Sequence, residues 1–501
     1  MTKARAPVPV PDLDWPAEKA GVLGRDAVAV WEELLRKLRS LPVARRAGDE
    51  EVRRAVVRAI PEEPLAPEEL LAHLREVVLE RSMYPGHPGF MAYVSGAGTV
   101  PGAAADLLAA AINQNVGGWR LSPAATEIEQ ALVRWFTGQF GLPESAGGLF
   151  VSGGAMANFS ALKVARDARC GFDVGAKGVA AGPPLALYSS TEAHHVIDRA
   201  ADMLGLGRDA VRRIPVDTEW RMISARLDRA IKRDVAAGVR PVAAVGTAGT
   251  VATGAVDPLD AIADVCQRHG LWFHVDAAYG GPAVLAAELR PLFSGIERAD
   301  SIAFDPHKWL YTPHSGGCVL YRDRSLAEGA FALNPDYIHE DKERSGHGFD
   351  HLTIGPQFSR GFAAFKVWIS LLAHGRAAYA RRIAQDVALA RYLAERVAER
   401  PEFELSAPAV LSICCFRYVP PDLPPSPGRD AYLDLLNERL MTEIWLDGRV
   451  LCSNAVLDGR FVLRACIVNF RTEAAECDRL LDVAAEHGAR LDRELRRTFR
   501  E

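Results

Sequence analysis

From about residue 148 onward, short apolar runs alternate with longer stretches of helical periodicity. The runs that resemble buried strands are Leu149–Ser152, Leu185–Ser189, Val242–Thr247, Leu271–Asp276, Ser301–Asp305 and Gly317–Tyr321. Helical patterns such as Ala155–Ala168 and Leu259–His269 lie between the earlier runs. This alternation predicts an α/β fold with a mostly parallel sheet of about seven strands, covered by helices on both faces.

The two flanks of this region have different patterns. Up to about residue 90 the chain is helical in composition, with amphipathic stretches at Glu50–Ile60 and Pro67–Arg81. Beyond residue 375 the predicted elements are a long helix to Arg400, strands Phe403–Ser406 and Val410–Phe416, a helix Tyr432–Glu443, a strand Phe461–Asn469 and a terminal helix from Glu473. We therefore predict a helical N-terminal segment (1–90), a large α/β domain (91–375) and a smaller α+β domain (376–501).

Composition narrows the class of protein without identifying it. The chain has 501 residues, 49% of them hydrophobic, and a formal net charge of -5. These values are ordinary for a globular protein. They give no reason to expect binding to nucleic acid or to an anionic membrane. The eight cysteines form no Cys-x-x-Cys pair, so no zinc site is predicted. The N-terminus lacks the apolar core of a signal peptide, and we expect a cytoplasmic enzyme.

Ligands of such sheets bind at the carboxyl ends of the strands, and a lysine stands at one of these ends. Lys308 follows the apolar run that closes with Phe304-Asp305 and precedes Trp309-Leu310. Partial burial would lower the pKa of its amine and make it a nucleophile, as a Schiff-base lysine requires. The alternative is a surface lysine on a loop.

A carboxylate closes another predicted strand. Asp276 is followed by Ala277, Ala278 and Tyr279. A carboxylate here can pair with the protonated pyridine nitrogen of pyridoxal 5′-phosphate (PLP), which keeps the ring an electron sink. The small Ala278 would let the ring lie flat against the backbone. The alternative is an N-cap aspartate for the next segment.

Two further motifs complete the pattern. Ser152-Gly153-Gly154 forms a turn into a helix, whose N-terminal amides suit a phosphate, although a tight strand–helix turn explains the same residues. His194 lies at a strand-to-helix junction, where it can stack on a ring or simply begin the helix. Taken together and in this order, these motifs favour a PLP site.

At this point the sequence resembles the PLP-dependent group II decarboxylases, which include the aromatic-L-amino-acid, histidine and glutamate decarboxylases. The matching segments are His87-Pro88, Ser122–Glu127, Ser152–Gly154, Ala193-His194, Thr247–Thr250, His274–Gly280, Asp305–Trp309, Ser359-Arg360, Lys366–Trp368 and Leu463-Arg464. They extend over most of the chain. The strings Asp-Pro-His-Lys-Trp and His-Val-Asp-Ala-Ala are the most specific of them.

The resemblance implies a fold-type I PLP enzyme that acts on an L-amino acid. It also implies a homodimer with active sites at the subunit interface. By matched position, Lys308 would carry the Schiff base, Asp276 would face the pyridine nitrogen and His194 would stack on the ring. The other implied cofactor contacts are Ala278 on the opposite ring face, Thr247 near the ring substituents, and Gly154 and Ala155 at the phosphate, helped by Asp305 or His307.

The loop between Phe331 and Gln357 decides which reaction the resemblance implies. In the family, a tyrosine of this loop protonates the substrate Cα after CO₂ leaves. Tyr337 matches the start of the loop instead, and the catalytic position falls on Phe349 or on His351. A histidine would preserve simple decarboxylation. A phenylalanine cannot donate a proton, and the product would then be an aldehyde, with ammonia and peroxide.

The sequence departs from the family in two places. Ala155 stands where many members have a Ser or Thr that binds the phosphate. The string Ala92-Tyr93-Val94-Ser95-Gly96 replaces the Ala-Tyr-Phe-Pro-Thr of members specific for aromatic substrates, which weakens the inference that the substrate is aromatic.

Three alternatives to a decarboxylase remain open. The first is another PLP outcome on the same scaffold, such as an aminotransferase, a desulfurase or an aldehyde synthase. The second is a nucleotide-binding oxidoreductase, although the spacing of Gly96, Gly98 and Gly102 does not fit a dinucleotide loop. The third is a non-enzymatic PLP-binding protein. His339, His347 and His351 are interpreted as part of a polar loop and not as a metal cluster.

Overall fold

A computed structural model describes residues 13–45, 48–332 and 348–498. Its larger sheet has the strand order β2-β8-β7-β6-β5-β3-β4. The strands are β2 (Gly147–Val151), β3 (Leu185–Ser190), β4 (Val211–Ile214), β5 (Arg240–Thr247), β6 (Trp272–Asp276), β7 (Ser301–Phe304) and β8 (Gly317–Tyr321). Strand β8 is antiparallel to both of its neighbours, and the remaining pairs are parallel. The predicted mostly parallel α/β sheet of fold type I is confirmed.

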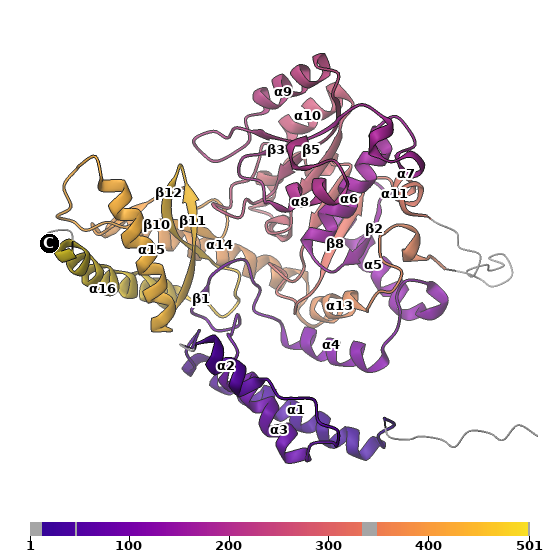
Figure 1. The fold of residues 1–501 in the computed structure, drawn as a ribbon. Helices are drawn as coiled ribbons and strands as arrows, with labels where there is room; N and C mark the ends of the chain where they lie inside the picture. The colour runs from indigo at the N-terminus through magenta and orange to yellow at the C-terminus, as the bar shows by residue number, and fades with distance from the viewer. Residues whose placement is uncertain (1–12, 46–47, 333–347, 499–501) are drawn as a thin grey trace, which may run out of the picture.

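Helices cover both faces of this sheet (Figure 1). On one face are α5 (Pro123–Gln139), α9 (Ser224–Ala236), α10 (Leu259–His269) and α13 (Ala363–His374); on the other are α6 (Gly154–Arg169), α8 (Val196–Met203) and α11 (Arg324–Phe331). Side chains alternate along β6, so that Phe273 and Val275 join the first core and Trp272 joins the second. The same alternation turns Asp276 toward α6.

A second sheet, with the order β1-β11-β12-β10-β9, forms the C-terminal part. Its strands are β1 (Phe90–Met91), β9 (Phe403–Leu405), β10 (Ile413–Tyr418), β11 (Leu451–Leu457) and β12 (Arg460–Cys466). Helices α14 (Arg376–Glu399), α15 (Arg429–Asp447) and α16 (Ala474–Thr498) pack against it. Because β1 pairs with β11, the segment that precedes the large sheet is tied to the C-terminal part.

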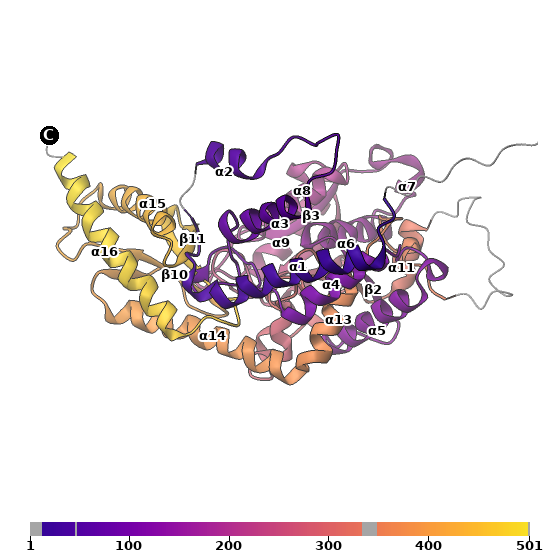
Figure 2. The same ribbon diagram turned by 90° about the horizontal axis from the view of Figure 1, so that it is seen from below.

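The N-terminal segment forms α1 (Ala17–Lys37), α2 (Asp49–Val56) and α3 (Pro67–Arg75). Figures 1 and 2 show these helices as a layer beside the body of the molecule. Helices α4 (Val100–Ile112) and the short α7 (Val174–Lys177) complete the α-helices of the described residues. In the part of the chain that is described, no helix is both long and apolar enough to cross a bilayer. The division at residues 90 and 375 stays a prediction.

A buried carboxylate joins the long helix α14 to the loop that carries Lys308. Asp386 is fully buried and accepts hydrogen bonds from Trp309 Nε1 (3.0 Å) and Tyr311 Oη (2.6 Å). It also forms an ion pair with Arg382 at 2.7 Å. A buried carboxylate with these partners fixes the groups around it. Removing it would take the acceptor from Trp309 Nε1 and Tyr311 Oη and the counter-ion from Arg382.

We therefore expect Asp386→Ala to lower the free energy of unfolding by about 3–5 kcal/mol. Asp478→Ala is a matched control, because Asp478 accepts from Tyr392 and Arg396 at a site that solvent reaches. Its loss should cost less than about 1 kcal/mol. Urea titrations followed by tryptophan fluorescence measure both values, and equal losses would show that Asp386 does not hold the loop.

Candidate active site

A cavity of about 530 Å³ opens at the carboxyl ends of β5, β6 and β7. Strands β11 and β12 of the C-terminal sheet supply its opposite wall, through Ser453, Val456 and Arg464 among others. Eight of the nine cofactor contacts predicted from the sequence line the cavity, all except His307: Gly154, Ala155, His194, Thr247, Asp276, Ala278, Asp305 and Lys308. The structure thus brings together candidates that are up to 154 residues apart in the chain, from Gly154 to Lys308.

The lysine lies against a buried carboxylate. Lys308 Nζ is 2.9 Å from Asp305 Oδ2, and the Asp305 side chain is almost completely buried. His307 lies behind the pair, with Nε2 3.9 Å from the same oxygen and Nδ1 2.6 Å from the carbonyl of Gly316. Burial lowers the pKa of the His307 imidazole below its ordinary value. Asp305 therefore holds the Lys308 amine in place at the floor of the cavity.

Asp276 ends β6 and presents its carboxylate to the cavity. Its Oδ1 accepts a hydrogen bond from the backbone N–H of Ala278 at 3.1 Å, so the local turn fixes the side chain. The parallel register pairs Asp276 with Thr247 of β5 and with Ala303 of β7. Asp276 is largely buried, and a carboxylate in such a position is a strong partner for a protonated ring nitrogen.

His194 lies at the start of α8, where its ring borders the cavity. Its Nδ1 accepts a hydrogen bond from the backbone N–H of Val196 at 3.0 Å. The neutral ring must then carry its proton on Nε2. Desolvation lowers the pKa of His194 below its ordinary value, although the charge of Asp276 opposes this change. A neutral, flat ring of this kind suits stacking on another ring.

The turn before α6 supplies hydrogen-bond donors for an anion. The first backbone bonds of this helix are donated by Met156 and Ala157, both to the carbonyl of Gly153. The N–H groups of Gly154 and Ala155 precede them and have no acceptor within the helix. Gly154 must be glycine here, because a Cβ atom would lie 2.6 Å from Asp305 Oδ2. The absence of a side chain lets the helix end approach Asp305 closely.

The residues present fit PLP. The cavity is lined by Gly154 and Ala155 with their free amides, by the carboxylate of Asp276 and by the amine of Lys308. These groups complement a phosphate, a protonated pyridine nitrogen and an aldehyde. Thr247 Oγ1, buried beside Asp276, has no hydrogen-bond partner among the described residues, and a ring substituent would supply one.

Sequence reasoning did not assign a role to the wall made by β11 and β12. Arg464 is 3% exposed, and its NH1 group donates to the carbonyl of Tyr93 (3.2 Å) and to Ser453 Oγ (3.1 Å). Its NH2 group has no partner among the residues the structure describes. The Leu463-Arg464 string was a signal for this residue, because a charge within an apolar strand needs a partner.

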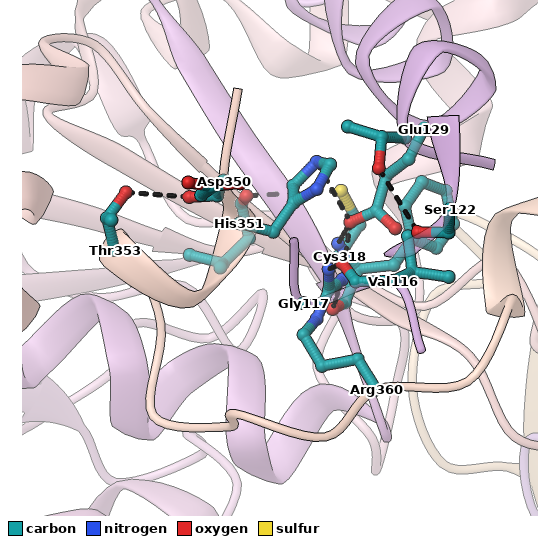
Figure 3. Close-up of polar contacts among 12 residues, drawn as sticks. Val116, Gly117, Ser122, Glu129, Cys318, Asp350, His351, Thr353 and Arg360 are labelled. Carbon is teal, nitrogen blue, oxygen red and sulfur yellow. Dashed lines mark hydrogen bonds and ion pairs between the residues drawn. The ribbon is translucent and has the colours of Figure 1, made fainter. Parts of the chain in front are cut away.

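The two loop candidates lie away from this cavity. His351 is fully buried, with Nε2 3.6 Å from Oε1 of Glu129, an oxygen that also accepts from Arg360 and from the backbone N–H of Phe150 (Figure 3). Burial lowers the pKa of the His351 imidazole. Phe349 packs with the core around α6 and edge-on to His351. Tyr337, His339 and His347 lie outside the described residues.

Comparisons with known proteins identify the family. A family model described as the pyridoxal-dependent decarboxylase conserved domain matches residues 50–419. An aromatic-L-amino-acid decarboxylase of Bacillus atrophaeus is 34% identical over 465 residues, which cover 93% of this chain and 94% of the relative. Cysteine sulfinic acid decarboxylase of Mus musculus is 37% identical over 357 residues, 70% of this chain and 72% of the relative.

Solved structures agree with this result. Oryza sativa TDC, crystallised with PLP and tryptamine, superposes with a TM-score of 0.89 at 28% identity, over 95% of this chain and 99% of that chain. Rhodiola rosea 4-hydroxyphenylacetaldehyde synthase superposes with a TM-score of 0.84 at 25% identity, over 95% and 98% of the two chains. From its matched domain, its relatives and its fold, this chain belongs to the family of PLP-dependent amino-acid decarboxylases.

Proposed function

We propose that the protein removes the α-carboxylate of an L-amino acid with an uncharged, apolar side chain, aromatic ones included, and releases CO₂ and an amine. One observation carries this proposal: the cavity that holds Lys308 and Asp276 has a single arginine, Arg464, on its opposite wall. That wall can bind one carboxylate and offers little to a second charged group.

In the proposed reaction, the residues that line the cavity have separate roles. When bound, PLP supplies the electron sink for the pair left as the bond from Cα to the carboxylate breaks. Lys308 would supply the amine that holds the cofactor. Asp276 would keep the ring nitrogen protonated, and His194 would pack against the ring. The free amides of Gly154 and Ala155 would bind the phosphate.

The substrate class follows from the charges that line the cavity. Arg464 has one guanidinium nitrogen to offer, which suits the single carboxylate of a monoacidic amino acid. Tyr93, Val251 and Val456 line the same cavity and add apolar surface. On the wall opposite Lys308, the described lining has no acidic side chain to bind a second amine and no cation besides Arg464 for a second acid. An uncharged side chain is therefore favoured.

A second outcome has a specific observation in its favour. Simple decarboxylation ends when Cα takes up a proton, and neither Phe349 nor His351 lines the cavity as the described residues form it. His351 is buried beside Glu129, with a lowered pKa. Without a donor the product would be an aldehyde, as the name of the Rhodiola rosea neighbour states for that protein. Aminotransfer on the same scaffold is a further alternative.

Product stoichiometry on a panel of L-amino acids decides between these outcomes. We expect CO₂ and amine in equal amounts from apolar and aromatic substrates, without peroxide. Aspartate, glutamate and 2,4-diaminobutyrate should react at least about a hundredfold more slowly, because a buried unpaired charge costs several kcal/mol. Peroxide equal to CO₂ would establish the aldehyde synthase instead.

We expect Asp276→Asn to bind PLP but to lose about three orders of magnitude in kcat, because an amide cannot hold the ring nitrogen protonated. Asp300→Asn is a matched control at the opposite end of the strands, where Asp300 Oδ2 accepts from the backbone N–H of Phe273. Visible absorbance reports cofactor binding in both variants. Activity of Asp276→Asn within about threefold of wild type would make Asp276 a structural residue only.

We further propose that the enzyme is a homodimer with its active sites at the interface. Helix α4 carries a row of exposed apolar side chains: Val100, Leu107, Leu108 and Ile112. Leu372 of the adjoining α13 is exposed as well. A patch of this kind favours an interface between subunits.

Leu108→Glu should therefore dissociate the protein and lower its activity, because burying a carboxylate in an apolar interface is unfavourable. Val235→Glu replaces an equally exposed valine on α9 and should change neither property. Sedimentation velocity measures the oligomeric state. A wild-type protein that is monomeric and fully active with PLP bound would contradict the proposal.

A further inference from the structure

A chain of hydrogen bonds runs behind the cavity from the sheet to the first turn of α6. Trp272 Nε1 donates to Ser301 Oγ at 2.8 Å, and that oxygen is 2.8 Å from His274 Nδ1. His274 Nε2 is 2.8 Å from Asn158 Oδ1. Asn158 Nδ2 donates to the carbonyl of Gly154 at 2.8 Å. His274 is fully buried and stands two residues before Asp276.

The chemistry of the end groups fixes the direction of this chain. At one end, an indole N–H can only donate, so the Ser301 hydroxyl accepts from Trp272 and is free to donate its own proton to His274 Nδ1. At the other end, the Asn158 amide turns its nitrogen to a carbonyl, so its oxygen must accept from His274 Nε2–H. Burial lowers the pKa of His274 to about 4, which makes the ring neutral near pH 7. The single proton of the neutral ring is therefore on Nε2.

The other tautomer would break the chain. With its proton on Nδ1, His274 could donate to the carbonyl of Ser301, which is 3.2 Å away. Its Nε2 lone pair would then face Asn158 Oδ1, and a flipped Asn158 amide would turn its oxygen to the carbonyl of Gly154. Either contact places two acceptors together in a buried site, which is costly. The Asn158 amide, whose nitrogen must face the carbonyl of Gly154, therefore selects the tautomer with the proton on Nε2.

The last hydrogen bond of the chain, from Asn158 to the carbonyl of Gly154, ends at the peptide group proposed to bind the phosphate. The carbonyl of Gly154 and the N–H of Ala155 belong to one planar peptide unit. A hydrogen bond that holds this carbonyl also sets the direction of the Ala155 N–H on the opposite side of the plane. That N–H is one of the two free amides at the start of α6.

We propose that His274 is a positioning residue, which acts through Asn158 to hold the Gly154–Ala155 peptide plane in the orientation that binds the phosphate of PLP. The inference rests on the proposal that this turn is the phosphate site. It assigns His274 a task separate from that of Asp276, which serves the ring nitrogen from the same strand.

The test compares two ligands that differ only in the phosphate. Apo-protein is titrated with PLP and with pyridoxal, and binding is followed by tryptophan fluorescence and visible absorbance. His274→Phe removes both ring nitrogens, and His274→Gln retains an N–H donor near the position of Nε2. We expect His274→Phe to raise the Kd of PLP about tenfold or more and to leave that of pyridoxal unchanged. His274→Gln should stay within about threefold of wild type for both ligands.

Tyr188→Phe is the matched control for the loss of a buried hydrogen bond in the same sheet. Tyr188 Oη donates to Asp234 at 2.9 Å, and this bond is not part of the hydrogen-bond chain through His274. It should leave both Kd values unchanged. If His274→Phe weakens PLP and pyridoxal equally, or weakens neither, the positioning role is wrong. Should His274→Phe fail to fold, Ser301→Ala provides a second test, because it removes the hydrogen bond that holds His274 Nδ1 in place.

Ala155→Asp tests the proposed phosphate site at the start of α6 separately from the positioning role of His274. A carboxylate at the exposed start of α6 should repel the phosphate and weaken PLP relative to pyridoxal. If Ala155→Asp binds PLP as tightly as wild type, the assignment of the phosphate site is wrong, and the inference falls with it. If Ala155→Asp weakens PLP and His274→Phe does not, only the positioning role is wrong.

Discussion

The parallel register of β5, β6 and β7 is the constraint on which the site depends. It pairs Thr247 with Asp276 and Asp276 with Ala303, so that three strand ends meet at one edge of the sheet. Because side chains alternate along a strand, Thr247 and Asp276 both point toward α6 and α8. A shift of one residue in any of these strands would turn its polar end into the apolar core under α5 and α10. The hydrophobic pattern that builds the fold therefore also positions the chemistry.

At this edge of the sheet, Asp305 contacts both Lys308 and the turn at Gly154. Its carboxylate lies 2.9 Å from the amine of Lys308 and is approached so closely by the turn at Gly154 that no Cβ atom fits there. A single buried group thus sets the distance between the lysine and the proposed phosphate turn. Such a carboxylate is stable in the interior only with a cation beside it. The Lys308 amine meets this requirement, and PLP bound to Lys308 as proposed would have to bring compensating groups of its own.

How far the sequence could predict the structure varied with the local pattern. Helix α10 has the predicted bounds Leu259–His269, because its apolar spacing is regular and a glycine follows it. Strand β4 was missed, since Arg212 and Arg213 interrupt its apolar residues at the edge of the sheet. Strand β11 was missed for a similar reason, because Ser453 and Asn454 hide its alternation. The cavity wall that carries Arg464 therefore could not be predicted from the sequence, because it forms only when β11 and β12 fold against the cavity.

Prediction of the candidate site from the sequence was limited in the same way. Residues at strand ends, such as Lys308 and Asp276, could be proposed from local strings, because the topology of a parallel sheet brings those ends together. The position of His351 could not, since it depends on packing against Glu129 and Arg360 from distant parts of the chain. His351 and Arg360 belong to the segment that begins at residue 348, and Glu129 binds both of them. Glu129 also accepts from the backbone N–H of Phe150 in β2, one residue before the strand ends and the turn into α6 begins. The segment that carries His351 and Arg360 is thus fixed to the same strand that leads into α6.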